Sequence, residues 1–228
     1  MYLTRFRINT ARTGARRLLA SPQSLHAAVL ASFAEPLAAS DGPRPLWRID
    51  QNSRHETLLY LVSPAKPDLT HLVEQAGWPT TGGWDSHEYG PFLDQLCAGT
   101  RWKFRLTANP VHSIRRKPEE PTKVTAHVTP HHQLAWLVKK QETAGFRVVE
   151  RAALPAGLPP DSRYELLVHQ RRNLSFRKRA QDAPVTLATA TFDGQLEVTD
   201  AETFRRTLTQ GIGRAKAYGC GLMTLAPL

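Results

Sequence analysis

The chain has 228 residues, 41% of them hydrophobic, and a formal net charge of +10. This size and apolar content suit one large or two small folded domains and exclude a disordered chain. The basic excess is mostly arginine, which indicates a polyanionic partner bound through phosphates or base edges and argues against a plain lysine-rich tail.

The first half of the chain is predicted to alternate strands and helices. Residues 2–8 alternate in polarity, which predicts a strand and lacks the apolar core of an export signal. Ser21 and Pro22 form a helix start, and the helical apolar stripe that follows ends at Pro36. We expect strands at 46–50, 57–62 and 101–108, an irregular loop at 64–91, and a short helix at 92–96.

A linker rich in proline and charge is predicted at 110–122, and a similar series of elements follows it. Thr129-Pro130 starts a helix that Gly145 stops, and Asp200 caps a second helix that runs to Gly211. Asp193-Gly194 predicts a tight hairpin between strands at 186–192 and 195–198. Further strands are expected at 123–128, 146–150, 164–170 and 222–225.

The order of elements is strand, helix, strand, strand, helix, strand, and it occurs twice. It predicts an α+β fold of two tandem ferredoxin-like (RRM-like, βαββαβ) domains with antiparallel sheets, at 1–110 and 123–228. Such sheets are frequent RNA-binding platforms, but the fold alone does not fix the function.

Two basic segments are candidates for RNA contact. The run 171–179 has five basic residues and no acid between two expected strands, which favours a basic hairpin arm. The tail 211–221 has four glycines around Arg214 and Lys216, so its backbone could approach a phosphate closely. A solvated charged loop and a packed glycine turn are the respective alternatives. The predicted RNA-binding residues are Arg171, Arg172, Arg177, Lys178, Arg179, Gly211, Gly213, Arg214, Lys216, Gly219 and Gly221.

His26, near the start of the first long helix, is the candidate for proton transfer, because histidine titrates near neutrality. An ordinary helix histidine is the alternative. His55 and His127 each begin a His-x-Thr tripeptide, the motif of two-histidine phosphoesterases, although His55 precedes its expected strand. The two cysteines form no Cys-x-x-Cys pair, so neither a zinc ribbon nor a disulfide framework is expected. A reducing cytoplasm fits this, and no segment has the length of an apolar membrane span.

Nearly end to end, the chain resembles the CasE family, the CRISPR precursor-RNA endoribonucleases of type I-E systems. The resemblance rests on residues 2–5, on Ser21-Pro22 followed by His26, and on the segments 46–48, 104–110 and 135–137. The tail from Gly211 to Leu222 completes it, and the Asn109-Pro110 strand end and the tail glycines are specific together.

The resemblance implies an enzyme that binds the stem-loop of CRISPR repeat RNA and uses no metal or other cofactor. A 2′-hydroxyl would attack the adjacent phosphate at the 3′ base of the stem and leave a 2′,3′-cyclic phosphate. His26 would be the general acid or base, the run 171–179 would grip the stem, and the tail would lie near the scissile phosphate. The protein would then stay on the mature guide RNA as a subunit of the interference complex.

Two positions depart from the family pattern. Some members carry a tyrosine three residues before the histidine and a lysine five residues after it, and these positions are Gln23 and Ala31 here. One histidine does not easily accept and donate a proton in a single step, so the second acid–base group is not identified. A non-catalytic RNA-binding subunit of the same ancestry is the rival interpretation.

Overall fold

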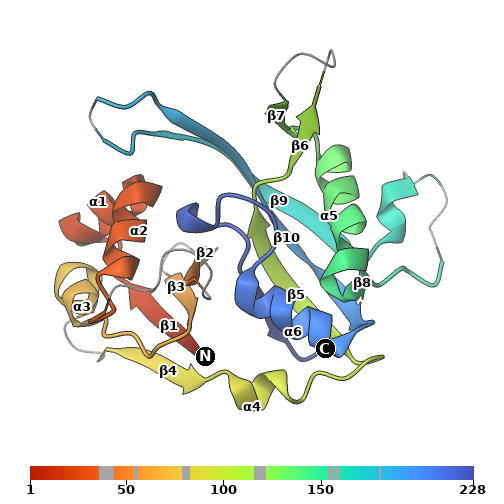
Figure 1. Ribbon diagram of the computed structural model, residues 1–228, viewed down its shortest axis with the longest axis horizontal. Helices are drawn as coiled ribbons and strands as arrows, with labels where there is room; N and C mark the ends of the chain where they lie inside the picture. Colours follow the sequence, from red (N-terminus) through yellow and green to blue (C-terminus); the bar gives the residue numbers. More distant parts are fainter. Residues whose placement is uncertain are drawn as a thin grey trace.

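The computed structural model describes residues 1–35, 44–53, 56–78, 83–115, 122–153, 157, 160–179 and 181–228. This part of the chain forms two antiparallel sheets, each covered by helices, and the sheets stand next to each other (Figure 1). None of its helices combines the length and the apolar character that a bilayer crossing requires.

The first sheet follows the βαββαβ order. Side by side, its strands are β2 (Leu46–Ser53), β3 (Glu56–Ser63), β1 (Tyr2–Ile8) and β4 (Trp84–Glu88). Its helices are α1 (Thr13–Ala20), α2 (Pro22–Leu30) and α3 (Thr70–Ala76). Phe6, Leu25 and Leu72 share one buried cluster, because alternate β1 residues and the apolar stripes of the helices meet there. The segment 64–91, expected to be irregular, therefore contributes a helix and an edge strand.

The second sheet has a similar order with one additional strand, β9 (Leu166–Phe176). Side by side, its strands are β11 (Met223–Ala226), β5 (Arg101–Ala108), β10 (Val185–Val198) and β8 (Phe146–Val148), and β9 also pairs with β10. Two helices, α5 (Pro130–Ala144) and α6 (Ala201–Gln210), enclose its core. The smaller elements are α4 (Gly90–Leu93), the ribbon of β6 (Val111–Ile114) with β7 (Lys123–Ala126), and the 3-10 helices η1 (Pro160–Arg163) and η2 (Lys216–Tyr218).

The division between the two sheets falls before β5. The predicted ranges 1–110 and 123–228 differ from this, because β5 pairs with β10 and β11 of the second sheet. The expected strand at 123–128 pairs instead with β6 in the separate ribbon. Alternation along a strand shows which side chains are buried but not which neighbour the backbone bonds to, so the sequence pattern could not assign β5.

Asp193-Gly194 is not a turn, contrary to the sequence prediction. Both residues lie inside β10, which runs unbroken from Val185 to Val198. A Cβ on Gly194 would come 2.4 Å from the carbonyl oxygen of Glu165, so close backbone packing explains the glycine. Asp193 pairs with Arg105 of β5 at 2.7 Å. The predicted helix starts at Ser21, Thr129 and Asp200 are confirmed, each with a side chain that accepts a backbone N–H.

Arg48 of β2 joins the two sheets. Its guanidinium is buried, binds both carboxylate oxygens of Asp50 at 2.6 and 2.8 Å, and donates to the carbonyl oxygens of Arg105 and Leu222 at 2.8 and 2.9 Å. It also donates to the Thr224 hydroxyl at 2.7 Å. One charged group thus satisfies acceptors on β2, β5 and β11, which fixes how the sheets meet.

Candidate functional site

His26 lies on the second turn of α2, whose start is fixed by its sequence. The Ser21 side chain accepts a hydrogen bond from the Ser24 N–H at 3.2 Å. The His26 ring is half-buried, and its Nδ1 is buried without a hydrogen-bond partner among the described residues. Burial lowers the pKa of His26, so the imidazole is neutral at pH 7 and able to accept a proton.

The glycine-rich tail is a packed loop, not a flexible one. The Ile212 N–H donates to the Gly221 carbonyl at 2.9 Å, and the Gly221 N–H donates to Thr107 of β5 at 2.7 Å. Gly219 has φ +78°, and a Cβ there would lie 2.7 Å from the Trp47 ring. The shape of the loop is therefore fixed by its own backbone hydrogen bonds and by the packing of Gly219.

The packed loop sets Tyr218 beside His26. The centroids of the two rings are 6.4 Å apart and their planes are inclined by 65°. Phe176, the last residue of β9, lies 4.7 Å from Tyr218 by the same measure. Sequence reasoning missed Tyr218, and the available signal was one aromatic side chain between Lys216 and the last two glycines.

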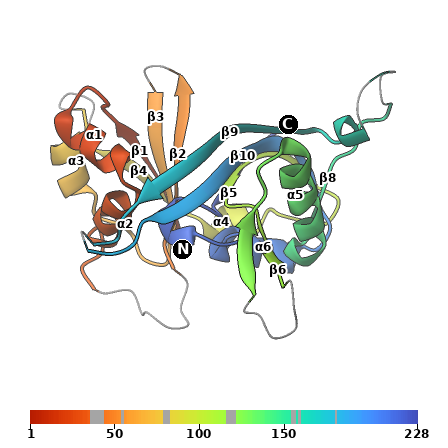
Figure 2. The ribbon, with the colours of Figure 1, turned by 90° about the horizontal axis from the view of Figure 1, so that it is seen from above.

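The basic run forms the predicted hairpin, with β9 longer than expected. The β9–β10 ribbon extends beyond the second sheet and reaches over to α1 and α2 of the first (Figures 1 and 2). Arg172 donates to the side chain of Gln51 on β2 at 2.7 Å. Its neighbour Arg171 turns the other way, toward the carbonyl oxygen of Val128 at 3.4 Å. Lys178 and Arg179 are exposed beyond the end of β9.

The predicted site residues fall into two groups. Arg172 and Gly219 line the cleft where α2, the ribbon and η2 come together, and Lys216 begins η2. His26 contacts this element through Tyr218. Gly211 and Gly213 lie instead against Leu46 and Trp136, so their packing role is away from His26. Arg214 is exposed and its backbone bridges to Asn109.

Two hollows meet at Tyr218. The first is a cleft of about 150 Å³ between α1, α2, β2, the ribbon and η2, with Arg172 on its wall. The second is an open groove of about 750 Å³ between the β6–β7 ribbon and the β9–β10 ribbon, lined also by Asn173 and Arg214. An extended polyanion lying in the groove would therefore pass Tyr218 on its way toward α2.

Comparison with known proteins identifies the family. A family model described as CRISPR associated protein matches residues 1–227. The CRISPR-associated endoribonuclease Cse3 of Thermus thermophilus is 32% identical over 231 residues, which cover 100% of both chains. The chain belongs to the CasE family of CRISPR-associated endoribonucleases.

A further relative and a solved structure support the assignment. The Cascade subunit CasE of Escherichia coli is 30% identical over 141 residues, 59% of this chain and 62% of that protein. A structure of Thermus thermophilus Cse3 bound to an RNA that represents a pre-cleavage complex matches with a TM-score of 0.76 at 29% identity, over 99% of this chain and 98% of that one. The predicted fold of two ferredoxin-like domains is thereby confirmed.

Of the two histidines in the His-x-Thr tripeptides, the one that the structure describes, His127, belongs to a separate histidine cluster. His55 is outside the described residues. His127 stacks on His112 with centroids 4.3 Å apart, and His132 lies 5.8 Å from it. Burial and these two neighbours lower the pKa of His127. Within the described ranges, no group of three or more His, Cys, Asp and Glu side chains is placed to hold a metal ion.

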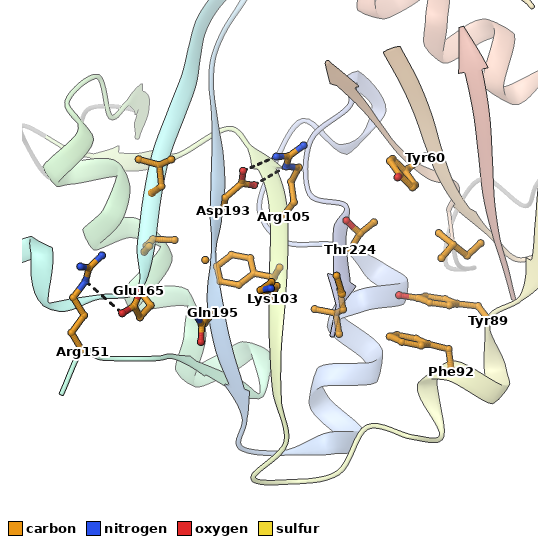
Figure 3. A pocket seen from close by; sticks show the side chains of 17 residues that line it. Tyr60, Tyr89, Phe92, Lys103, Arg105, Arg151, Glu165, Asp193, Gln195 and Thr224 are labelled. Atoms are coloured by element: carbon orange, nitrogen blue, oxygen red, sulfur yellow. Dashed lines mark hydrogen bonds and ion pairs between the residues drawn. The ribbon is translucent and has the colours of Figure 1, made fainter. Parts of the chain in front are cut away.

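A larger groove, of about 950 Å³, opens between the two sheets and contains none of the predicted site residues (Figure 3). Tyr89 and Phe92 stack on its wall with centroids 5.6 Å apart. Its two carboxylates are paired, Asp193 with Arg105 at 2.7 Å and Glu165 with Arg151 at 3.6 Å. The two arginines on its lining are therefore neutralised by these carboxylates, so the groove is poorly suited to a polyanion.

Proposed function

We propose that this CasE-family protein is a metal-independent endoribonuclease that cuts the stem-loop of CRISPR repeat RNA at the 3′ base of the stem. The observation that carries the proposal is His26, a neutral half-buried imidazole set where α2, the glycine-rich loop and the basic ribbon converge. The full-length similarity to the endoribonuclease Cse3 supplies the reaction class.

The reaction is a strand transfer within the RNA. The 2′ oxygen attacks the adjacent phosphorus, the bond from phosphorus to the 5′ oxygen breaks, and a 2′,3′-cyclic phosphate and a 5′-hydroxyl remain. A base must take the 2′ proton and an acid must supply the 5′ proton. His26 is neutral at pH 7, so it suits the base. Holding the three reacting atoms in line lowers the barrier further.

The basic ribbon and the tail are proposed to hold the RNA. Arg171 and Arg172 leave β9 on opposite sides, and the exposed residues Lys178 and Arg179 extend the positive surface past the strand end, next to Arg177. Such an arm binds phosphates by releasing counterions. In the tail, Arg214 is exposed and Lys216 is half-buried. Burial, and then the charge of Arg44, lowers the pKa of Lys216.

We also propose that the product stays bound as guide RNA within the type I-E interference complex, in the cytoplasm. The Escherichia coli relative is named as a Cascade subunit, which supports assembly with partner subunits. The two cysteines of this chain are free thiols in the structure, as a reducing compartment permits. Retention predicts a burst of one cut per protein followed by slow turnover.

The test is cleavage of the host repeat RNA in excess chelator. Wild type is expected to cut, whereas a substrate with 2′-deoxy at the cut site and the His26→Ala protein are expected to bind without cutting. His87→Ala, on an exposed edge of β4, is the matched histidine control and should cut normally. Binding without any cutting by wild type would make the chain a guide-RNA binding subunit, and normal cutting by His26→Ala would refute the site.

A further inference from the structure

The chemistry of the proposed reaction needs a second proton-transfer group near His26. Position 23, one turn before His26 on α2, is an amide, and position 31, at the end of that helix, is a methyl group. Neither side chain can supply a proton to the 5′ oxygen at neutral pH. The group must therefore come from another element that packs against α2.

The helices α1 and α3 and the 3-10 helix η2 all contact α2, and the side chain that makes a ring contact with His26 is Tyr218 of η2. The two rings meet edge to face with their centroids 6.4 Å apart. A phenol hydroxyl donates a hydrogen bond and belongs to the side chains used in general acid–base catalysis. The ring is half-buried and lines both the small cleft and the open groove, so Tyr218 is accessible from both hollows.

The surroundings hold Tyr218 in this place from two directions. Phe176 of the basic ribbon packs on its ring, with centroids 4.7 Å apart. Gly219, the next residue, has φ +78° and is pressed against Trp47 of β2, so the backbone that carries Tyr218 has little freedom. The competing group on η2 is Lys216, whose stem packs at Gly221. Among the described residues of η2, the side chain in contact with the His26 ring is Tyr218.

We propose that Tyr218 is the second member of the acid–base pair and that its hydroxyl protonates the 5′ leaving oxygen. This inference rests on the proposed function. His26 takes the proton from the 2′ oxygen while the new bond to phosphorus forms. As the bond to the 5′ oxygen breaks, the Tyr218 hydroxyl gives its proton to that oxygen. Solvent then returns the proton from imidazolium to phenolate, which restores both groups.

The experiment compares two RNAs under single-turnover conditions with Tyr218→Phe, which keeps the ring and removes the hydroxyl. The first RNA is the natural repeat, and the second has sulfur in place of the bridging 5′ oxygen at the cut, because a thiolate leaves without a proton. We expect Tyr218→Phe to cut the natural RNA about 10²- to 10⁴-fold more slowly with unchanged binding, and to cut the sulfur RNA at the wild-type rate. His26→Ala should be slow on both RNAs.

The matched control is Tyr60→Phe, the same change at a half-buried tyrosine of the large groove, which should leave both rates unchanged. A normal rate of Tyr218→Phe on the natural RNA refutes the assignment. An equal defect on both RNAs also refutes it, because the hydroxyl then acts before or outside leaving-group protonation. Either result, together with loss of cutting in His26→Ala, leaves the proposed function standing. If the wild-type protein does not cut the natural RNA, both the proposed function and the Tyr218 assignment are refuted.

Discussion

The large groove between the sheets and the small cleft beside α2 differ in a way that volume alone does not show. The large groove measures about 950 Å³ and the cleft beside α2 only about 150 Å³. In the groove, the carboxylates of Asp193 and Glu165 are bound by arginines. Next to the cleft, His26 Nδ1 and Trp47 Nε1 are buried without partners in the described part of the chain.

Two consecutive residues of β2 point toward the small cleft and the large groove, respectively. Trp47 lines the cleft and supports Gly219, whereas Arg48 lies over the ring of Tyr60, which lines the groove, at 5.5 Å. Both ion pairs of the groove lie within the second sheet and its flanking segments, whereas Arg48 makes the hydrogen bonds that join the two sheets. The proposed site therefore lies at the smaller hollow, where buried polar atoms without partners are next to a basic arm, and not at the larger one.

The largest expected effect is on stability and concerns Arg48, whose hydrogen bonds join the two sheets. Arg48→Met leaves Asp50 buried without its main partner and should lower the free energy of unfolding by about 3–5 kcal/mol. The matched control is Arg5→Met, which removes an ion pair with Asp85 at 2.9 Å whose side chains are 56% and 60% exposed. Such exposed pairs contribute at most about 1 kcal/mol. Urea unfolding measures both, and equal losses would contradict the assigned role of Arg48.

The second prediction compares the effect on cleavage of substituting two glycines that have similar φ values, one beside the cleft and one remote from it. Gly219→Ala places a Cβ 2.7 Å from Trp47 and should displace Tyr218, which lowers the cleavage rate by about a hundredfold if proton transfer is lost. Gly99 has φ +84° but open space around it, so Gly99→Ala carries the same backbone cost without the clash. Single-turnover cleavage should fall only for Gly219→Ala, and a comparable fall for Gly99→Ala would point to general destabilisation.

The sequence predicted local features well, because local chemistry decides them. The caps at Ser21, Thr129 and Asp200 need one side chain near its own helix, and all three are present. Gly145 ends α5 with φ +77°, the conformation that glycine adopts readily. The basic hairpin also formed as predicted, since its charge and its strand residues lie in one segment.

What the sequence missed depends on distant partners. The Asp193-Gly194 dipeptide carries the usual signal of a turn, yet Arg105 and the Glu165 carbonyl, both remote in sequence, place it inside β10. Tyr218 was missed for the same reason, since it is 192 positions from His26 (218 minus 26) and only the folded loop joins them. His26 itself was found through a family resemblance, and its role stays a proposal.

The third prediction tests whether the arm, and not basic charge in general, holds the RNA. Changing Lys178 and Arg179 together to Ala should weaken RNA binding by about tenfold at moderate salt and reduce the slope of log Kd against log salt by roughly one to two. Arg101→Ala with Arg147→Ala removes the same charge from two arginines that already pair with Glu197. This control should leave the salt slope almost unchanged, and equal slopes for both double variants would mean that binding follows net charge alone.

The smallest expected effect is the pH dependence of cleavage between pH 5 and 8. Burial lowers the pKa of His26 below its ordinary value of 6.5, so a neutral base is already available at pH 6.5 and above. The single-turnover rate should therefore reach its plateau at a lower pH than an ordinary histidine would allow, and fall by up to about tenfold per pH unit only below the lowered pKa. RNA binding measured at each pH removes the effect of weaker association, and His87→Ala should keep the same profile. A rate that instead rises as the pH falls from 7 to 5 would show that His26 donates a proton. His26 would then be the acid, and the roles assigned to His26 and Tyr218 would be exchanged.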